Sequence, residues 1–123
     1  MDNGWIGVDL DGTLARYDKW VSSEYIGPPI TSMVERVKQW IASGQEVRIF
    51  TARVSPISAA HNGITVDRCK EIIREWCMEY IGSDLIVTHE KDYRMIAIYD
   101  DVAVHVVKNT GDVLPETSNH GLV

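Results

Sequence analysis

The sequence lacks an excess of basic residues and has no long apolar run. Its 12 Lys and Arg are outnumbered by 18 Asp and Glu, which gives a formal net charge of −6 at pH 7. A general nucleic-acid binder usually carries a basic surface, so this balance argues against that class. No stretch approaches the ~20 apolar residues that a membrane-spanning helix needs, so we expect no membrane partner.

Cysteine is also scarce. Cys69 and Cys77 stand eight residues apart on one predicted helix. At a rise of ~1.5 Å per residue they would be about 12 Å apart, too far for a disulfide. Free thiols, and a start that enters the first predicted strand without a secretory signal pattern, indicate a reducing, cytoplasmic location. We expect both cysteines to be small core residues.

What the sequence does have is strand and helix patterns in alternation. Its 123 residues, 45% of them hydrophobic, are typical of one globular domain. Apolar runs predict strands near residues 6–8, 47–50, 85–88, 95–99 and 104–107. Helical spacing predicts helices between residues 31 and 43 and between 65 and 81, and loops are expected at 15–30 and 54–64. This order indicates an α/β fold with a mostly parallel five-stranded sheet and helices on both faces, followed by a polar tail over residues 112–123.

The most informative stretch is Asp9-Leu10-Asp11-Gly12-Thr13, directly after the first apolar run. Residues two apart in an extended chain share a face, so Asp9 and Asp11 are expected to point the same way. Two close carboxylates repel each other and are costly to bury without a cation. The pair therefore predicts a site for a hard divalent ion such as Mg²⁺. A solvated Asp-Gly turn is the plainer alternative, but the longer string is more specific than that turn.

Other chemically useful residues follow later predicted strands. Thr51 ends the second strand, and Asp100 and Asp101 end the very apolar fourth one. Ligands in open parallel sheets bind beyond the carboxyl ends of the strands, where these residues should converge. Lys91 lies between the third and fourth strands and could balance the charge of a phosphate, with Arg94 as the fallback.

The order of these residues resembles the four motifs of the haloacid dehalogenase superfamily, in its phosphatase branch. Those motifs are Asp-x-Asp, a Thr or Ser after a second strand, a Lys, and a pair of acids after a later strand. The matching residues here are Asp9 with Asp11, Thr51, Lys91, and Asp100 with Asp101. The resemblance implies a three-layer Rossmann-like hydrolase domain over residues 1–111.

The resemblance also implies a role for each residue. Asp9 would attack phosphorus and form an aspartyl-phosphate, while Asp11 would act as general acid and then general base. Mg²⁺ would be held by Asp9, the backbone carbonyl of Asp11, and Asp100, with Asp101 binding directly or through water. The implied substrate-binding residues are Leu10, Gly12, Thr51, Ala52, Arg53 and Lys91.

The spacing of the motifs leaves no room for a cap domain. Only 36 residues separate Leu14 from Thr51, and a loop and a helix fill them. An open site suits bulky phosphates or a cap supplied by a second copy of the chain. The string Thr51-Ala52-Arg53 resembles members that act on nucleotides or polynucleotide ends, and Arg53 could contact a second phosphate or form a surface salt bridge. The aromatics of the loop, Tyr17, Trp20 and Tyr25, either pin the loop or stack on a base.

The sequence thus predicts a small Mg²⁺-dependent phosphatase that acts on a phosphorylated small molecule or a nucleic-acid end. Two other classes stay open. One is a phosphate- or nucleotide-binding module without turnover. The other is a receiver-type signalling domain, in which the phosphorylated aspartate follows a later strand than it does here.

Overall fold

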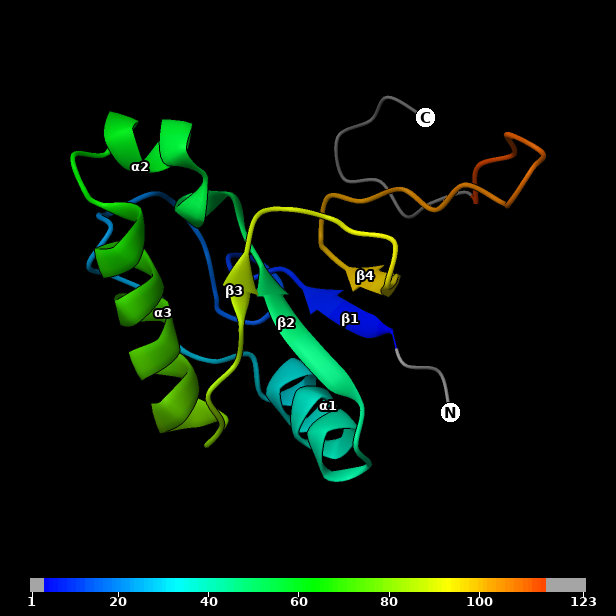
Figure 1. Cartoon of the computed structure of the whole chain (residues 1–123), viewed down its shortest axis with the longest axis horizontal. Coiled ribbons are helices and arrows are strands. Elements are labelled where there is room, and N and C mark those ends of the chain that lie inside the picture. Colours follow the sequence, from blue (N-terminus) through cyan, green and yellow to red (C-terminus); the bar gives the residue numbers. More distant parts are fainter. Residues whose placement is uncertain (1–3, 115–123) are drawn as a thin grey trace.

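The computed structural model describes residues 4–114 and shows an α/β arrangement around a parallel sheet. The strands found in this range are β1 (Trp5–Val8), β2 (Glu46–Phe50), β3 (Val87–Thr88) and β4 (Met95–Tyr99). All pairings are parallel, and the strand order is β3-β2-β1-β4 (Figure 1). The predicted α/β class and the parallel sheet are therefore confirmed.

Helices fill most of the connections between the strands. Both long helices match the sequence prediction: α1 (Thr31–Ala42) and α3 (Val66–Tyr80). The segment predicted as a loop also contains a 3₁₀ turn, η1 (Ala52–Val54), and a short helix, α2 (Pro56–His61). The prediction missed α2 because six residues are too few to show a helical period. A local signal for its start was present, since Ser55 accepts a bond from the Ser58 N–H and Pro56 follows it.

Both long helices pack on one face of the sheet. Ile6 and Val8 of β1 pair with Val47 and Ile49 of β2, so these four side chains share a face. They belong to a single buried cluster that takes Met33, Val34 and Val37 from α1 and Cys69, Ile73, Trp76 and Cys77 from α3. The helices thus cover the same side of the sheet rather than opposite sides.

The other face of the sheet is covered by its own side chains. Trp5 is fully buried, with the Arg48 guanidinium 4.5 Å from its ring centroid and Phe50 at 6.5 Å from it. The carboxylates of Glu46 and Asp92 lie 2.7 and 3.5 Å from Arg48 nitrogens. The predicted helices on both faces are not confirmed, because the described helices contribute their apolar stripes to the opposite side.

The predicted fifth strand over residues 104–107 is not confirmed. Val106 forms only an isolated antiparallel bridge with Val113, and the Val107 N–H donates to the Asp112 carbonyl. These contacts make a local hairpin-like turn and not a rung of the sheet. Of the predicted tail, residues 115–123 lie outside the described residues.

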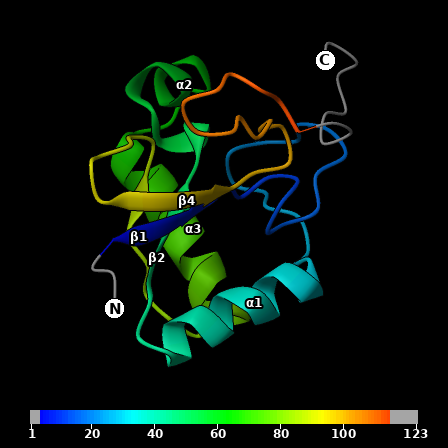
Figure 2. The ribbon, with the colours of Figure 1, turned by 90° about the vertical axis from the view of Figure 1, so that its right-hand side faces the viewer.

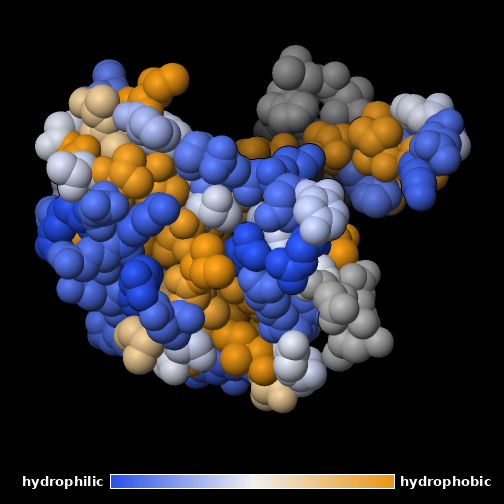
Figure 3. Space-filling model, viewed as in Figure 1, coloured by the Kyte–Doolittle hydropathy of each residue, from blue (hydrophilic) through white to orange (hydrophobic). Residues whose placement is uncertain are grey.

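At the other edge of the sheet, β3 is only two residues long, against the four predicted. An apolar band lies over β3 on the face seen in Figure 3, between hydrophilic surfaces over α3 and β2. Ile86, which precedes the strand, has an exposed fraction of 55%. A very short edge strand limits pairing with other chains.

The predicted loop at residues 15–30 is confirmed, and it lies beside the end of the sheet where β1 terminates (Figure 2). Trp76 of α3 donates its indole N–H to the Gly27 carbonyl and so ties the loop to the body. Ala15 forms bridges with Asp11 and Pro29, which close the loop at its base. The loop is thus held at both its start and its end.

The two cysteines lie in the core of the protein. Cys69 and Cys77 are both buried and free, as expected for core residues. Burial raises the pKa of the Cys77 thiol to about 12, which keeps it protonated. Among the helices of residues 4–114, none has the length and apolar character needed to cross a bilayer.

The packing of α3 gives a stability test with a matched control. Ile73 is fully buried in the cluster, whereas Ile57 of α2 has an exposed fraction of 85%. We expect Ile73→Ala to lower the free energy of unfolding by about 2–5 kcal/mol, because it leaves a cavity. Ile57→Ala should change it by less than about 0.5 kcal/mol. Urea unfolding of both variants measures the difference, and equal effects would contradict this core assignment.

Candidate functional site

The candidate site lies at the carboxyl ends of the parallel strands. Asp9 directly follows β1, Thr51 follows β2, and Asp100 follows β4. Backbone bonds continue the pairing past the strand ends: the Asp9 N–H donates to the Tyr99 carbonyl, and the Thr51 N–H to the Thr88 carbonyl, both at 2.9 Å. Parallel pairing therefore brings together residues that are up to 91 positions apart in the sequence.

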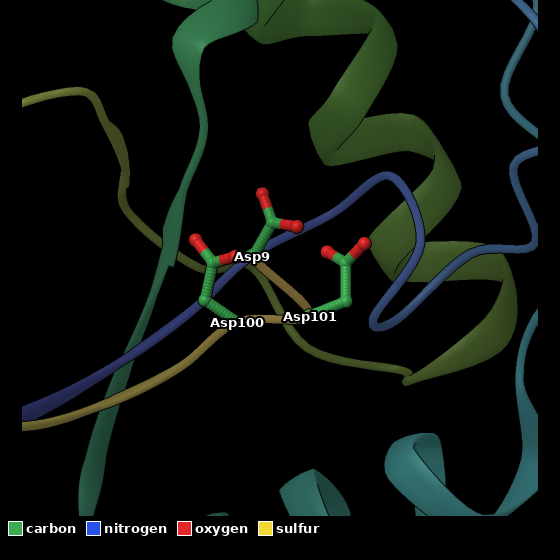
Figure 4. Close-up of side chains that lie close together, drawn as sticks. All are labelled: Asp9, Asp100 and Asp101. Atoms are coloured by element: carbon green, nitrogen blue, oxygen red, sulfur yellow. The ribbon is translucent and has the colours of Figure 1, made fainter. Parts of the chain in front are cut away.

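Three carboxylates meet at this end of the sheet. Asp9, Asp100 and Asp101 each offer one oxygen, and these oxygens lie within 4.8 Å of one another. Figure 4 shows the three side chains projecting to the same side from the ends of β1 and β4. The Val102 N–H donates to Asp100 Oδ1 at 2.8 Å, which fixes the orientation of that side chain.

Thr13 links the first motif to the later pair of acids. Its Oγ1 lies 3.2 Å from Asp9 Oδ2 and 3.1 Å from Asp101 Oδ1, and it accepts the Asp101 backbone N–H at 3.0 Å. One hydroxyl therefore holds the two chain segments in register. The sequence motif contains Thr13, but sequence reasoning assigned it no role in the site.

The close approach of the first motif to Asp101 also requires a glycine at position 12. Its φ is +89°, and a Cβ built there would lie 2.6 Å from Asp101 Oδ2. A side chain at this position would meet both backbone strain and a carboxylate. The substrate-binding role predicted for Gly12 is accompanied by this steric role.

The pKa of Asp9 is raised to about 8. Burial is the largest cause, followed by a hydrogen bond with Asp101 and the negative charges of Asp100 and Asp101. A bound cation would replace the proton, because it stabilises the charged carboxylate. Three convergent carboxylate oxygens are ligands that suit Mg²⁺, so the donor set fits the predicted metal.

Asp11 lines the cleft as well, but its side chain pairs with Arg53. Its two oxygens accept Arg53 Nε at 2.8 Å and Arg53 Nη2 at 2.9 Å, and its carboxylate is not part of the cluster of three. The sequence predicted that Asp9 and Asp11 share a direction. Both residues do line the same cleft, but only Asp9 belongs to the carboxylate cluster, because Asp11 lies in the turn beyond β1 and pairs with Arg53.

Arg53 is buried, with an exposed fraction of 7%. Besides Asp11, it donates to the carbonyls of Tyr25 and Ser23, and its guanidinium lies 4.8 Å from the Trp20 ring centroid. The predicted surface salt bridge of Arg53 is therefore a buried ion pair, and its predicted contact with a second phosphate stays a prediction, since Arg53 also lines the cleft.

Thr51 lies at the predicted place, with an exposed fraction of 4%. Its Oγ1 accepts the Arg53 backbone N–H at 3.2 Å and caps η1. That bond uses an oxygen lone pair and not the O–H, so the hydroxyl can still donate to a phosphate oxygen. The next residue, Ala52, is exposed and lines the cleft, whereas the Leu10 side chain is fully buried in the core.

Neither Lys91 nor Arg94 is among the residues that line the cleft. Arg94 contacts Glu46, and its carbonyl accepts the Trp5 N–H, so it lies at the amino end of the strands. Lys91 is exposed and precedes Asp92, whose carboxylate accepts the Trp5 indole N–H at the same end. The fallback to Arg94 is therefore wrong, and Lys91 lies outside the cleft in this structure.

His89 lines the cleft, although no role was predicted for it from the sequence. It lines a hollow of about 420 Å³ together with Asp9, Asp100 and Asp101. Sequence reasoning missed it, although it directly follows β3 as Asp9 follows β1. Position after a strand end was the signal that could have identified it.

Two aromatic side chains of the loop at residues 15–30 also border the cleft. Tyr17 borders the hollow beside His89 and also an adjoining one of about 300 Å³, which Trp20, Ser58 and Asn62 line. Their exposed fractions are 45% for Tyr17 and 41% for Trp20. The cleft is thus open, with a carboxylate floor and a partly aromatic side.

Comparison with known proteins gives a fold relationship only. No protein-family model matches the chain, and no curated protein does. A solved structure of a conserved protein from Bacteroides thetaiotaomicron is similar, with a TM-score of 0.51 and 20% identity. The match covers 93% of this chain and 83% of that one. It supports the architecture and carries no information on activity.

The raised pKa of Asp9 predicts how stability changes with pH. The folded value of about 8 exceeds the ordinary 3.8, so the folded state retains a proton that the unfolded state has lost over this range. Without divalent cations, the free energy of unfolding should fall as the pH rises from about 4 to about 8. Urea unfolding at about pH 5 and pH 8 measures it in wild type and Asp9→Asn. Relative to wild type, the free energy of unfolding of Asp9→Asn should be higher at about pH 8 than at about pH 5. If the difference between the two proteins is the same at both pH values, the raised pKa of Asp9 is contradicted.

Gly12 provides a second test, with Gly44 as its control. Both have φ near +89° (+89° and +88°), but nothing lies within 4 Å of a Cβ at Gly44. Gly12→Ala and Gly44→Ala should each lose about 1–2 kcal/mol to backbone strain. Only Gly12→Ala should also weaken Mg²⁺ binding, because its methyl group displaces Asp101. Titration calorimetry with Mg²⁺ measures this, and equal affinities in the two variants would contradict it.

Proposed function

We propose that this protein is a Mg²⁺-dependent phosphomonoester hydrolase that works through an aspartyl-phosphate on Asp9, as the resemblance to the haloacid dehalogenase superfamily implies. The observation that carries the proposal is the separation of the carboxylates into two environments. Asp9 lies with Asp100 and Asp101, while Asp11 is held apart by Arg53. A nucleophile and a proton carrier need such different surroundings to do different work.

In the first step, a carboxylate oxygen of Asp9 attacks phosphorus, and the bond from phosphorus to the leaving oxygen breaks. The proton of Asp11 passes to that oxygen, which departs as an alcohol. In the second step, Asp11 takes a proton from water, whose oxygen attacks phosphorus and releases Asp9. A bound Mg²⁺ would supply positive charge that offsets the repulsion between the phosphate and the carboxylates.

Asp9, Asp100 and Asp101 are the residues that would hold the ion. The Thr51 hydroxyl would donate to a phosphate oxygen, and the exposed backbone near Ala52 lies on the same cleft. His89 is the basic group that lines this hollow, and we assign it a contact with the phosphate in place of Lys91. Phosphoryl transfer depends mainly on such positioning and charge stabilisation.

The substrate class we propose is a nucleotide or a polynucleotide-end phosphate. Tyr17 and Trp20 border the cleft and could lie against a base, and the elements between the motifs, α1 to α3, form no separate domain over the cleft. The net charge of −6 favours a small nucleotide over a long polynucleotide. A further cap could come from a second copy of the chain.

A second candidate function is phosphate or nucleotide binding without turnover. The observation in its favour is the position of Lys91, which lies outside the cleft although the family pattern places a lysine at the phosphate. Against it stands the complete set of acids around Asp9. Turnover assays separate the two.

The proposed chemistry is tested by phosphate release with and without Mg²⁺. The panel contains p-nitrophenyl phosphate, nucleoside monophosphates, sugar phosphates, and oligonucleotides with a 3′- or 5′-phosphate. We expect Mg²⁺-dependent release from the nucleotides, and loss of turnover in Asp9→Asn because the nucleophile is gone.

Asp11→Asn should lower turnover about 10²- to 10⁴-fold through lost proton transfer. The exposed Asp67 on α3 supplies the control, since Asp67→Asn removes the same charge away from the cleft. Undiminished activity in Asp9→Asn would overturn the mechanism. Binding of nucleotides without release would favour the second candidate.

A further inference from the structure

The side chain of Arg53 joins three segments of the chain. It is provided by η1 and contacts Asp11 after β1, together with Ser23, Tyr25 and Trp20 of the loop at residues 15–30. Its own carbonyl accepts the Cys69 thiol of α3 at 3.3 Å. The guanidinium therefore has a fixed place, set by neighbours on several elements.

Arg53 borders the cleft, but within the described residues its side-chain hydrogen bonds all go to protein oxygens. Nε and Nη2 bind the two oxygens of Asp11 in a bidentate pair, Nη2 also donates to the Tyr25 carbonyl at 3.0 Å, and Nη1 to the Ser23 carbonyl at 3.4 Å. A bidentate pair of this kind fixes the plane of a carboxylate as well as its distance. A substrate phosphate would have to displace Asp11 to bind Arg53 through the same bidentate pair of donors.

Trp20 strengthens this arrangement. Its ring lies over the guanidinium at 4.8 Å, and the exposed fraction of Arg53 is only 7%. Contact with an aromatic face favours the cation and shields the ion pair from water. Among the aromatics on the cleft wall, Tyr17 has no such contact with Arg53, so the two rings have different tasks.

We propose that Arg53 is the positioning residue for Asp11: it fixes the carboxyl group in the direction from which it serves the leaving oxygen and then the attacking water. This inference rests on the proposed function and adds a role that the family motifs do not assign. Proton transfer requires a donor within hydrogen-bond reach of the reacting oxygen, so loss of orientation costs rate even when Asp11 is intact.

If Arg53 positions Asp11, the effect of losing Arg53 should depend on the leaving group. An alkoxide is a poor leaving group and needs the proton of Asp11 as its bond to phosphorus breaks. The p-nitrophenolate ion leaves without that proton, so its departure does not depend on the orientation of Asp11. The later attack of water on the aspartyl-phosphate still needs Asp11 as base, whichever group has left.

The test compares Arg53→Met with wild type on an alkyl phosphate and on p-nitrophenyl phosphate, with Mg²⁺ present. On the alkyl phosphate we expect kcat to fall about 10²- to 10⁴-fold with little change in KM. On p-nitrophenyl phosphate we expect a rapid burst of one p-nitrophenol per enzyme, followed by slow turnover. In an Asp11→Asn background, Arg53→Met should cause no further loss.

Arg48 supplies the matched control. It also lies over a tryptophan ring and contacts carboxylates, but on the far face of the sheet. Arg48→Met should keep the wild-type kinetics on both substrates. Circular dichroism and a cooperative thermal transition establish that each variant is folded. If Arg53→Met does not fold, Arg53→Lys decides, because one ammonium keeps the charge but cannot bind both Asp11 oxygens in one plane.

The outcomes separate the two proposals. Wild type that releases no phosphate from either substrate overturns the hydrolase proposal, and this inference with it. An active wild type whose Arg53 variant shows a raised KM on both substrates without a burst means that Arg53 binds the substrate phosphate. Additive losses in the Asp11→Asn background, or wild-type kinetics in folded Arg53→Lys, would likewise overturn the positioning role alone.

Discussion

Mutual repulsion among the carboxylates at one end of the sheet is the constraint on which the rest of the site depends. Parallel pairing of β1 with β4 brings Asp9 beside Asp100 and Asp101, with oxygens within 4.8 Å of one another. Such a cluster is unfavourable unless a proton or a cation is added. In the protein alone the proton is retained, as the pKa of about 8 for Asp9 indicates. The fold thus maintains a local electrostatic cost that a divalent ion would relieve.

The charge of Asp11, the fourth acid at this end of the sheet, is balanced in a different way. Asp11 has an internal cation, Arg53, and a tryptophan covers that cation. The first motif therefore supplies two carboxylates. Arg53 neutralises the charge of Asp11, whereas a bound cation would be needed to neutralise that of Asp9. The same contact anchors the loop at residues 15–30, because Arg53 also binds two of its carbonyls. In this way the charge arrangement of the site and the position of its aromatic wall depend on a single side chain.

The fold was predictable where the sequence pattern is local and long. The helical period of α1 and α3 and the short apolar runs of β1, β2 and β4 can each be recognised within one segment of the chain. Whether helices cover the second face of the sheet was not predictable in this way. A strand that is apolar on both sides suggests helices on both faces, but here Trp5, Arg48 and Phe50 cover the second face by themselves. The run at residues 104–107 is apolar enough for a strand, yet pairing depends on a neighbour, and Val106 meets Val113 rather than the sheet.

The sequence by itself determined the parallel α/β class and the position of Asp9, Thr51, Asp100 and Asp101 at strand ends, because periodicity and chain order are enough for that. Only the tertiary structure decided which of these groups act together. Asp11 lines the cleft with Asp9 but stays outside its carboxylate cluster, because it pairs with Arg53, which is 42 residues away in the sequence. His89 lines the cleft and Lys91 does not, while the next residue, Asp92, contacts Trp5 at the amino end of β1. Such contacts join side chains that are distant in the sequence, and the local sequence pattern around each residue does not predict them.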